Sequence, residues 1–177
     1  MHSRVFNVSS TIENMEGYLT EEEVYERMNG YCDYANNETN LLEDLKWLFG
    51  LFGDEVESKL IRHDASESDY DEEFYEVPYE VIKDFVVKFK TKKVESLKEC
   101  MNGDMKKLIR FFEEGKCEDD VSYNIMYMIE KTINDRLSFY INYEYCFHTL
   151  DYAVIDVFDK LEEGKSLYFY QSFDYHY

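Results

Sequence analysis

Turn-forming residues are scarce in this sequence, which has one proline and seven glycines among its 177 residues. Glycine and proline are the strongest local signals for turns. Their scarcity disfavours a fold of many short strands joined by tight turns, and it favours long helices. Long hydrophobic runs are missing as well, so no segment is expected to cross a membrane as a helix.

Paired cysteine motifs are also missing. The four cysteines are Cys32, Cys100, Cys117 and Cys146, and no two of them have C-x-x-C spacing. The first ten residues, MHSRVFNVSS, lack the apolar stretch of a secretory signal. We therefore expect reduced, structural thiols in a cytoplasmic protein without membrane attachment.

The common signatures of catalysis and metal binding are not found. There is no glycine-rich phosphate loop, no G-x-S-x-G and no H-E-x-x-H. His63 and Asp64 form a doublet like that of HD phosphohydrolases, but those enzymes need an upstream histidine, and only His2 precedes it. Cys146 and His148 are too few for a zinc site and do not identify a catalytic cysteine. We therefore expect no catalytic residue, no metal site and no cofactor.

One acidic segment has part of a calcium-loop pattern. Positions 1, 3, 5 and 12 of an EF-hand loop are filled by Asp69, Asp71, Glu73 and Glu80. Position 6 of such a loop needs glycine for its sharp turn, and here it is Phe74. The pattern therefore does not predict a calcium site.

Basic residues are outnumbered, since 19 of them stand against 39 acidic residues and leave a net charge of −20. A field of this sign repels nucleic acid and anionic membranes and attracts basic proteins. Residues 64–80 contain eight acidic residues and no basic one, whereas residues 83–116 carry a local net charge of +4. We expect the 64–80 segment to lie on the surface, because so many carboxylates are costly to bury unpaired.

Aromatic residues are abundant, with 17 tyrosines, 13 phenylalanines and one tryptophan making up 18% of the chain. A buried tyrosine hydroxyl needs a hydrogen-bond partner, so many of these rings are expected to be half-exposed, as interface residues are. Biased codon usage in an A/T-rich genome is the alternative explanation of the same composition.

Helical periodicity dominates the middle of the chain. Thr20 and Glu23 form a capping-box pattern, Asn40 or Thr39 begins a second helix, and Asn102 with Gly103 marks a break between later helices. We expect at least four residues of the second helix to be buried out of the set Leu45, Trp47, Leu48, Phe49 and Phe52.

Strand patterns are found in three places, and the acidic segment 64–80 is left open between a solvated loop and an edge strand. Residues 4–9 and 166–177 read as strands that pair with each other, and residues 137–148 are left open between strand and helix. The predicted fold is α+β and predominantly helical, with about six helices and a short sheet from the N- and C-terminal strands. An all-α bundle is the alternative. We expect a single acidic globular domain over residues 1–177.

Negative charge combined with aromatic rings favours a protein that binds a basic partner. In composition the chain resembles phage-encoded anti-CRISPR and antirestriction proteins and bacterial immunity proteins against nuclease toxins, although no shared motif transfers residues from them. The resemblance implies a non-enzymatic, stoichiometric inhibitor in the host-cell cytosol. Its partner would be a nuclease or nucleic-acid-binding complex whose basic groove it occupies by charge mimicry, without binding nucleic acid or membrane itself.

The expected partner-binding residues lie in the acidic segment. They are Glu67, Asp69, Tyr70, Asp71, Glu72, Glu73, Tyr75 and Glu76. Two alternatives stay open: a structural or scaffold subunit whose charge maintains solubility, and an enzyme of an unrecognised family. The sequence leaves the oligomeric state open.

Overall fold

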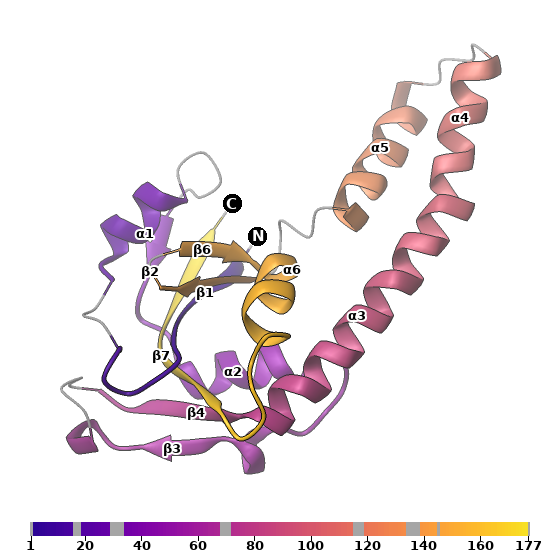
Figure 1. Cartoon of the computed structure of the whole chain (residues 1–177). Helices are drawn as coiled ribbons and strands as arrows, with labels where there is room; N and C mark the ends of the chain where they lie inside the picture. The colour runs from indigo at the N-terminus through magenta and orange to yellow at the C-terminus, as the bar shows by residue number, and fades with distance from the viewer. Residues whose placement is uncertain are drawn as a thin grey trace. The chain divides into compact units, whose positions relative to one another are not determined.

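The computed structural model describes residues 2–15, 19–28, 34–67, 72–114, 119–133, 139–144 and 146–176. Contacts divide the chain into two compact units. The first comprises residues 1–86 and 138–177 and is built on a β-sheet, and the second comprises residues 87–137 and is helical wherever it is described (Figure 1). A single domain over the whole chain stays a prediction.

A mixed sheet forms the centre of the first unit. Its strands lie in the order β3-β4-β7-β1-β5-β6, and β2 also pairs with β7. Their bounds are β1 (His2–Ser9), β2 (Tyr34–Asn36), β3 (Ile61–His63), β4 (Phe74–Pro78), β5 (Phe139–Tyr143), β6 (Cys146–Thr149) and β7 (Ser166–His176). The expected pairing of the first and last strands is confirmed, because β1 and β7 run antiparallel with Val5 opposite Phe173.

The size of this sheet corrects the predicted fold class. We expected a predominantly helical protein with a short sheet from two terminal strands, or an all-α bundle, and both expectations are wrong. The described residues form a seven-stranded sheet, and the fold is a mixed α+β fold with a substantial sheet. β2 and β3 have three residues each, which is too short for period-two alternation to show in the sequence.

The segment left open between strand and helix is a β-hairpin. β5 and β6 are antiparallel, with Tyr143 opposite Cys146. Glu144 lies in the turn with a φ of 49°, the left-handed conformation that tight hairpin turns require. β5 also runs parallel to β1, so this hairpin extends the sheet beyond the N-terminal strand.

The helices begin largely where the capping patterns predict. Their bounds are α1 (Glu21–Arg27), α2 (Leu41–Phe49), α3 (Tyr79–Asn102), α4 (Asp104–Glu114), α5 (Asp119–Ile133) and α6 (Leu150–Ala153), with α6 followed by a π-helical turn (Val154–Phe158). Thr20 and Glu23 form the expected capping box of α1. Asn40 caps α2 by accepting a hydrogen bond from the backbone N–H of Glu43. No helix in the described parts of the chain has both the length and the apolar character to cross a bilayer.

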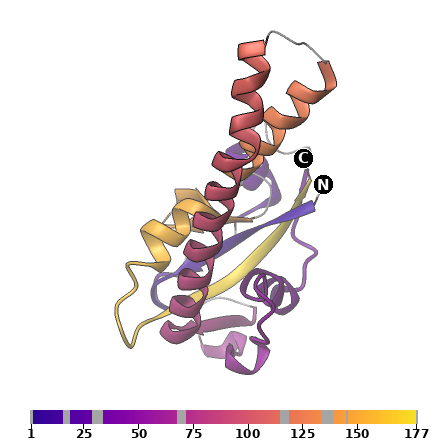
Figure 2. The ribbon, with the colours of Figure 1, turned by 90° about the vertical axis from the view of Figure 1, so that its right-hand side faces the viewer.

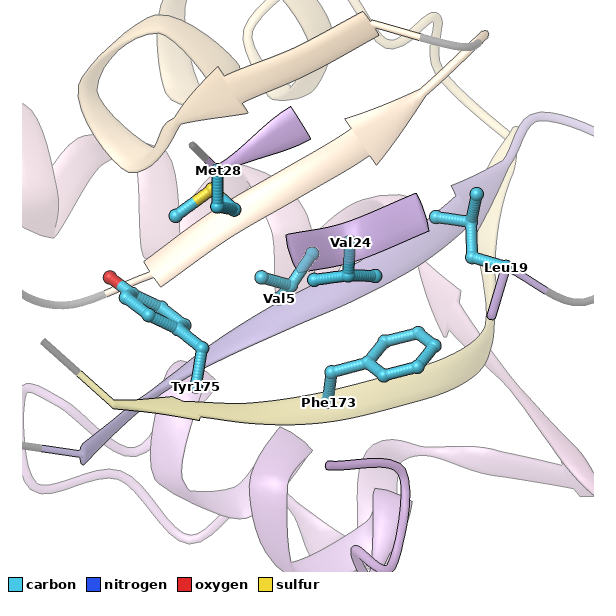
Figure 3. Close-up of a cluster of buried hydrophobic side chains, with 6 residues drawn as sticks. All are labelled: Val5, Leu19, Val24, Met28, Phe173 and Tyr175. Carbon is cyan, nitrogen blue, oxygen red and sulfur yellow. The ribbon is translucent and has the colours of Figure 1, made fainter. Parts of the chain in front are cut away.

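Both faces of the sheet are covered by apolar side chains. On one face, Val24 and Met28 from the α1 region pack with Val5 of β1 and with Phe173 and Tyr175 of β7 (Figure 3). On the other face, phenylalanine rings from the strands and from the covering helices contact one another. Phe6, Phe139 and Phe169 come from the strands, and Phe49, Phe85 and Phe158 come from α2, α3 and the π-helical turn.

The core contribution of α2 is smaller than expected. Leu45, Leu48 and Phe49 are buried, but Phe52 is only half-buried and Trp47 is 43% exposed, so the expectation of four buried residues is wrong. A helix of nine residues presents one stripe to the sheet, and Trp47 lies at the border of that stripe. Its ring packs edge-on against Phe139, with ring centroids 4.8 Å apart.

The second unit is a helical hairpin. Helical hydrogen bonds continue through Gly103, since its N–H donates to the Glu99 carbonyl and its own carbonyl accepts from the Lys107 N–H. The predicted boundary between two helices is confirmed at this point, since α3 ends at Asn102 and α4 begins at Asp104, but within this unit the two helices continue as one extended rod (Figure 2). α5 lies alongside α4.

Candidate functional site

The structure scatters the acidic segment over several local environments. Asp69, Tyr70 and Asp71 lie outside the described residues, and Glu67 ends a short 3₁₀ turn. Glu72 and Glu73 come directly before β4, and Tyr75 and Glu76 lie within it. Among the carboxylates of the segment whose exposure the structure describes, those of Asp64, Glu72, Glu73 and Glu80 are exposed, as we expected, and that of Glu76 is half-buried.

Tyr75 is a buried residue that holds the Glu73 carboxylate in place, and its ring is not exposed to a partner. Its side chain is buried, and its hydroxyl donates a hydrogen bond of 3.0 Å to Oε1 of Glu73. Burial, reinforced by the Glu73 carboxylate, raises the pKa of Tyr75 to about 12, so the phenol stays protonated and continues to donate. The guanidinium of Arg62 lies 2.8 Å from the other oxygen of Glu73. Glu73 is therefore held in place from two sides.

Glu76 has a structural role that joins three strands. Its carboxylate accepts a hydrogen bond of 2.6 Å from the hydroxyl of Ser166 on β7 and lies 3.1 Å from Nε2 of His63 on β3. The ring of His63 also stacks on Phe74, with centroids 4.8 Å apart. His63 is therefore engaged with Glu76 and Phe74, and the described residues contain no group of three possible metal ligands around it or elsewhere.

A polar hollow of about 280 Å³ lies on β7, between the parts of that strand that pair with β4 and with β2. β4 pairs with residues 166–169 and β2 with residues 174–176, so residues 170–172 lie between the two neighbouring strands. The hollow is lined by Asn37, Thr39, Asn40, Leu41, Glu72, Glu73, Tyr170, Gln171 and Ser172. It thus brings two of the expected site residues together with a segment that the sequence did not single out.

The floor of the hollow is fixed by hydrogen bonds. The hydroxyl of Thr39 donates to the backbone carbonyl of Ser172 over 3.0 Å, and the hydroxyl of Ser172 donates to Asp44 over 2.8 Å. Asp44 is buried and accepts a further bond of 2.7 Å from Nε of Arg4. A charge-compensated network of this kind costs little reorganisation when a ligand arrives.

Carboxylates border the hollow. Glu72 and Glu73 line it directly, and Glu21 accepts a hydrogen bond of 2.9 Å from the backbone N–H of Asn37. Glu38 and Glu43 are exposed and lie next to lining residues in the chain. The charged side chains that line the hollow are the carboxylates of Glu72 and Glu73, so the hollow suits a guanidinium, an ammonium or another donor-rich cationic group and disfavours phosphate.

Sequence reasoning missed the residues opposite the carboxylates. Asn40 carries a local signal, but that signal indicates the helix cap that it forms for α2, and Thr39 bonds instead to Ser172 across the fold. Gln171 and Ser172 lie in the aromatic C-terminal strand β7, which pairs with strands on both sides and has most of its side chains buried.

Comparison with known proteins gives no match: no family model, no curated protein and no solved structure corresponds to this chain.

Proposed function

We propose that this protein is a non-enzymatic acidic binding protein that inhibits a nucleic-acid-binding enzyme or complex by occupying its basic groove. The observation that carries the proposal is the polar hollow on β7, which Glu72 and Glu73 line together with a floor fixed by hydrogen bonds among Thr39, Ser172 and Asp44. A partner of this kind presents lysine and arginine side chains that normally contact phosphates. One such side chain fits the volume and the chemistry of the hollow.

Charge on the first unit supports this proposal. Residues 1–86 and 138–177 contain 29 acidic and 8 basic residues, which leaves a net charge of −21. A charge of this size accelerates encounter with a basic partner, and ionic strength screens the attraction beyond about 8 Å at physiological salt. The proposed role is of the kind played by phage anti-defence proteins, such as anti-CRISPR and antirestriction proteins, or by toxin immunity proteins.

A fixed carboxylate contributes more to such binding than a mobile one. Glu73 is held by the Tyr75 hydroxyl and by Arg62, so little conformational entropy is lost when it pairs with an incoming cation. Glu72 is exposed beside it and adds a second charge without that restraint. Together they place two neighbouring carboxylates where a cationic side chain of a partner could donate hydrogen bonds to them.

The test begins with capture of the partner from host lysate at low and at high salt, followed by surface plasmon resonance. Replacing Glu72 and Glu73 by Lys should lower the association rate at least about tenfold at low salt, because the attraction becomes a local repulsion. Glu162 and Glu163 are an equally exposed acidic pair outside the hollow and provide the matched control. Changing that pair to Lys should alter the rate far less.

A competition assay then separates charge mimicry from other binding. The partner's nucleic acid should be displaced in proportion to the amount of this protein bound. A partner that binds equally well at low and high salt, or that retains its nucleic acid in the complex, would overturn the proposal. Such a result would leave the acidic surface as a solubility feature and favour the scaffold alternative.

A further inference from the structure

A second hollow, of about 390 Å³, lies in the first unit where β1 and β5 end and β7 begins. β1 and β5 run parallel, with Val8 opposite Tyr143, so their carboxyl ends lie at the same end of the sheet. Tyr143 at the end of β5 lines the hollow, as do Ser10 and Thr11, which follow β1. Ligands commonly bind at the carboxyl ends of parallel strands. The volume also falls within the range of small-molecule sites, about 300–1,000 Å³.

The π-helical turn after α6 forms one wall of this second hollow. The N–H of Asp159 donates to the carbonyl of Val154 over 2.9 Å, which is the wide hydrogen bond that defines such a turn. Asp156 and Val157 of the turn line the hollow. π-Helical turns are rare and occur frequently at functional sites, so this wall favours a binding role.

The charged groups of the second hollow comprise one closed ion pair and one unpaired charge of each sign. Lys160 pairs with Asp156 over 2.8 Å. Among the described residues, the Lys165 ammonium and the Glu162 carboxylate have no ion-pair partner. The N–H of Lys165 donates to the carbonyl of Glu162 over 3.1 Å, and Gly164 between them has a φ of 76°. This turn, which requires glycine, fixes both residues at the rim.

Hydroxyl groups and apolar side chains complete the lining. The Tyr143 hydroxyl makes a hydrogen bond with Ser10, and partial burial raises the pKa of Tyr143, so its phenol is protonated at neutral pH. Val157 and Leu167 are buried and supply apolar surface, to which the half-buried Leu161 adds. A ligand here meets charges of both signs, hydroxyl groups and an apolar wall.

We propose that the second hollow binds a free α-amino acid with an apolar side chain. Lys165 pairs with the α-carboxylate of the ligand, and Glu162 accepts from its α-ammonium. The side chain of the ligand packs against Val157 and Leu167. Such a zwitterion has no net charge, so the −21 of the first unit, which repels small anions, does not oppose its entry. This site is separate from the hollow on β7 and does not depend on the proposed inhibitor function.

Nuclear magnetic resonance of the isotope-labelled full chain tests the proposal without any protein partner. L-Leucine and L-phenylalanine should shift the amide signals of Tyr143, Val157 and Leu167 and leave those of Gln171 and Ser172 unchanged. N-Acetyl-L-leucine lacks the ammonium and L-leucinamide lacks the carboxylate. Each should bind at least about tenfold more weakly than L-leucine, because one charge-assisted hydrogen bond is lost.

Substitutions at the rim assign each charge to its ligand group. Glu162→Gln should abolish the preference for L-leucine over N-acetyl-L-leucine, and Lys165→Met should abolish the preference over L-leucinamide. Glu163→Gln and Lys59→Met change equally exposed residues outside the second hollow and are the matched controls, which should keep both preferences. The proposal is overturned if neither amino acid shifts these signals or if N-acetyl-L-leucine binds the wild type as tightly as L-leucine. Equal losses in Glu162→Gln and Glu163→Gln would overturn it as well.

Discussion

Asp44 on α2 accepts a hydrogen bond of 2.7 Å from the guanidinium of Arg4 on β1, and both side chains are largely shielded from water. The same guanidinium donates to Asp174 on β7 over 2.6 Å, and its carbon lies 5.4 Å from the centre of the Trp47 ring. Arg4 thus joins α2 to the two central strands. Because Asp44 also accepts from Ser172, this ion pair is continuous with the floor of the hollow.

Removing the Asp44 carboxylate should destabilise the first unit strongly. We expect Asp44→Ala to lower the free energy of unfolding by about 3 kcal/mol, because Arg4 loses a buried counter-charge and the Ser172 hydroxyl loses its acceptor. Urea denaturation followed by circular dichroism measures the effect. Asp174→Ala is the comparison, and it should cost less, since Asp174 is more exposed. Equal losses for the two variants would contradict this account.

A ladder of amide side chains crosses the sheet and fixes the segment before α1. The Asn142 amide donates to Asn7 over 2.9 Å, Asn7 donates to Gln171 over 2.7 Å, and Gln171 exchanges two hydrogen bonds with the backbone of Leu19. Gln171→Leu should leave the Leu19 N–H and C=O without these partners and cost about 1–3 kcal/mol. Hydrogen exchange of the Leu19 amide should accelerate more than that of amides in β1, and unchanged protection would contradict the prediction.

Alkaline pH should lower the free energy of unfolding through ionisation of Tyr75. Its pKa is raised to about 12 in the folded state, mainly by burial and then by Glu73. A tyrosine in the unfolded chain titrates near pH 10. The unfolded state therefore loses the proton first, so the contribution of this group is complete below about pH 10 and is lost as pH rises toward 12. Tyr75→Phe should flatten this part of the stability profile, measured by urea denaturation between pH 9 and 12.

Leucines within α2 and just beyond its end should differ sharply in how much stability they lose on truncation to alanine. Leu48 is fully buried, so Leu48→Ala should cost about 2–5 kcal/mol through lost transfer energy and the cavity that remains. Leu51, just beyond the helix, is exposed, and Leu51→Ala should change the stability by less than about 0.5 kcal/mol. Thermal unfolding followed by circular dichroism compares the two. A similar loss for both would mean that this segment is covered by a partner in solution.

Several local features could be predicted from the sequence. The capping box of Thr20 and Glu23, the Asn40 cap and the pairing of the first and last strands were all expected, because each depends on residues close in the chain or on strong period-two alternation. The fold class was not predicted correctly. The three residues of β3 and the five residues of β4 carry too little periodicity to identify a strand with certainty.

The residues of the candidate site, like the fold, could be predicted only in part. The sequence by itself determined that the protein is acidic and that its cysteines form no C-x-x-C motif. It also determined that Glu72 and Glu73 lie in a segment too charged to be buried. Only the tertiary structure decided that the side chains of Tyr75 and Glu76 make hydrogen bonds within the fold. It also decided that Thr39 bonds to Ser172, 133 residues away in the chain, at the hollow that Glu72 and Glu73 line. Composition and local spacing set charge and capping, whereas the place of each strand in the sheet depends on long-range pairing that no single segment encodes.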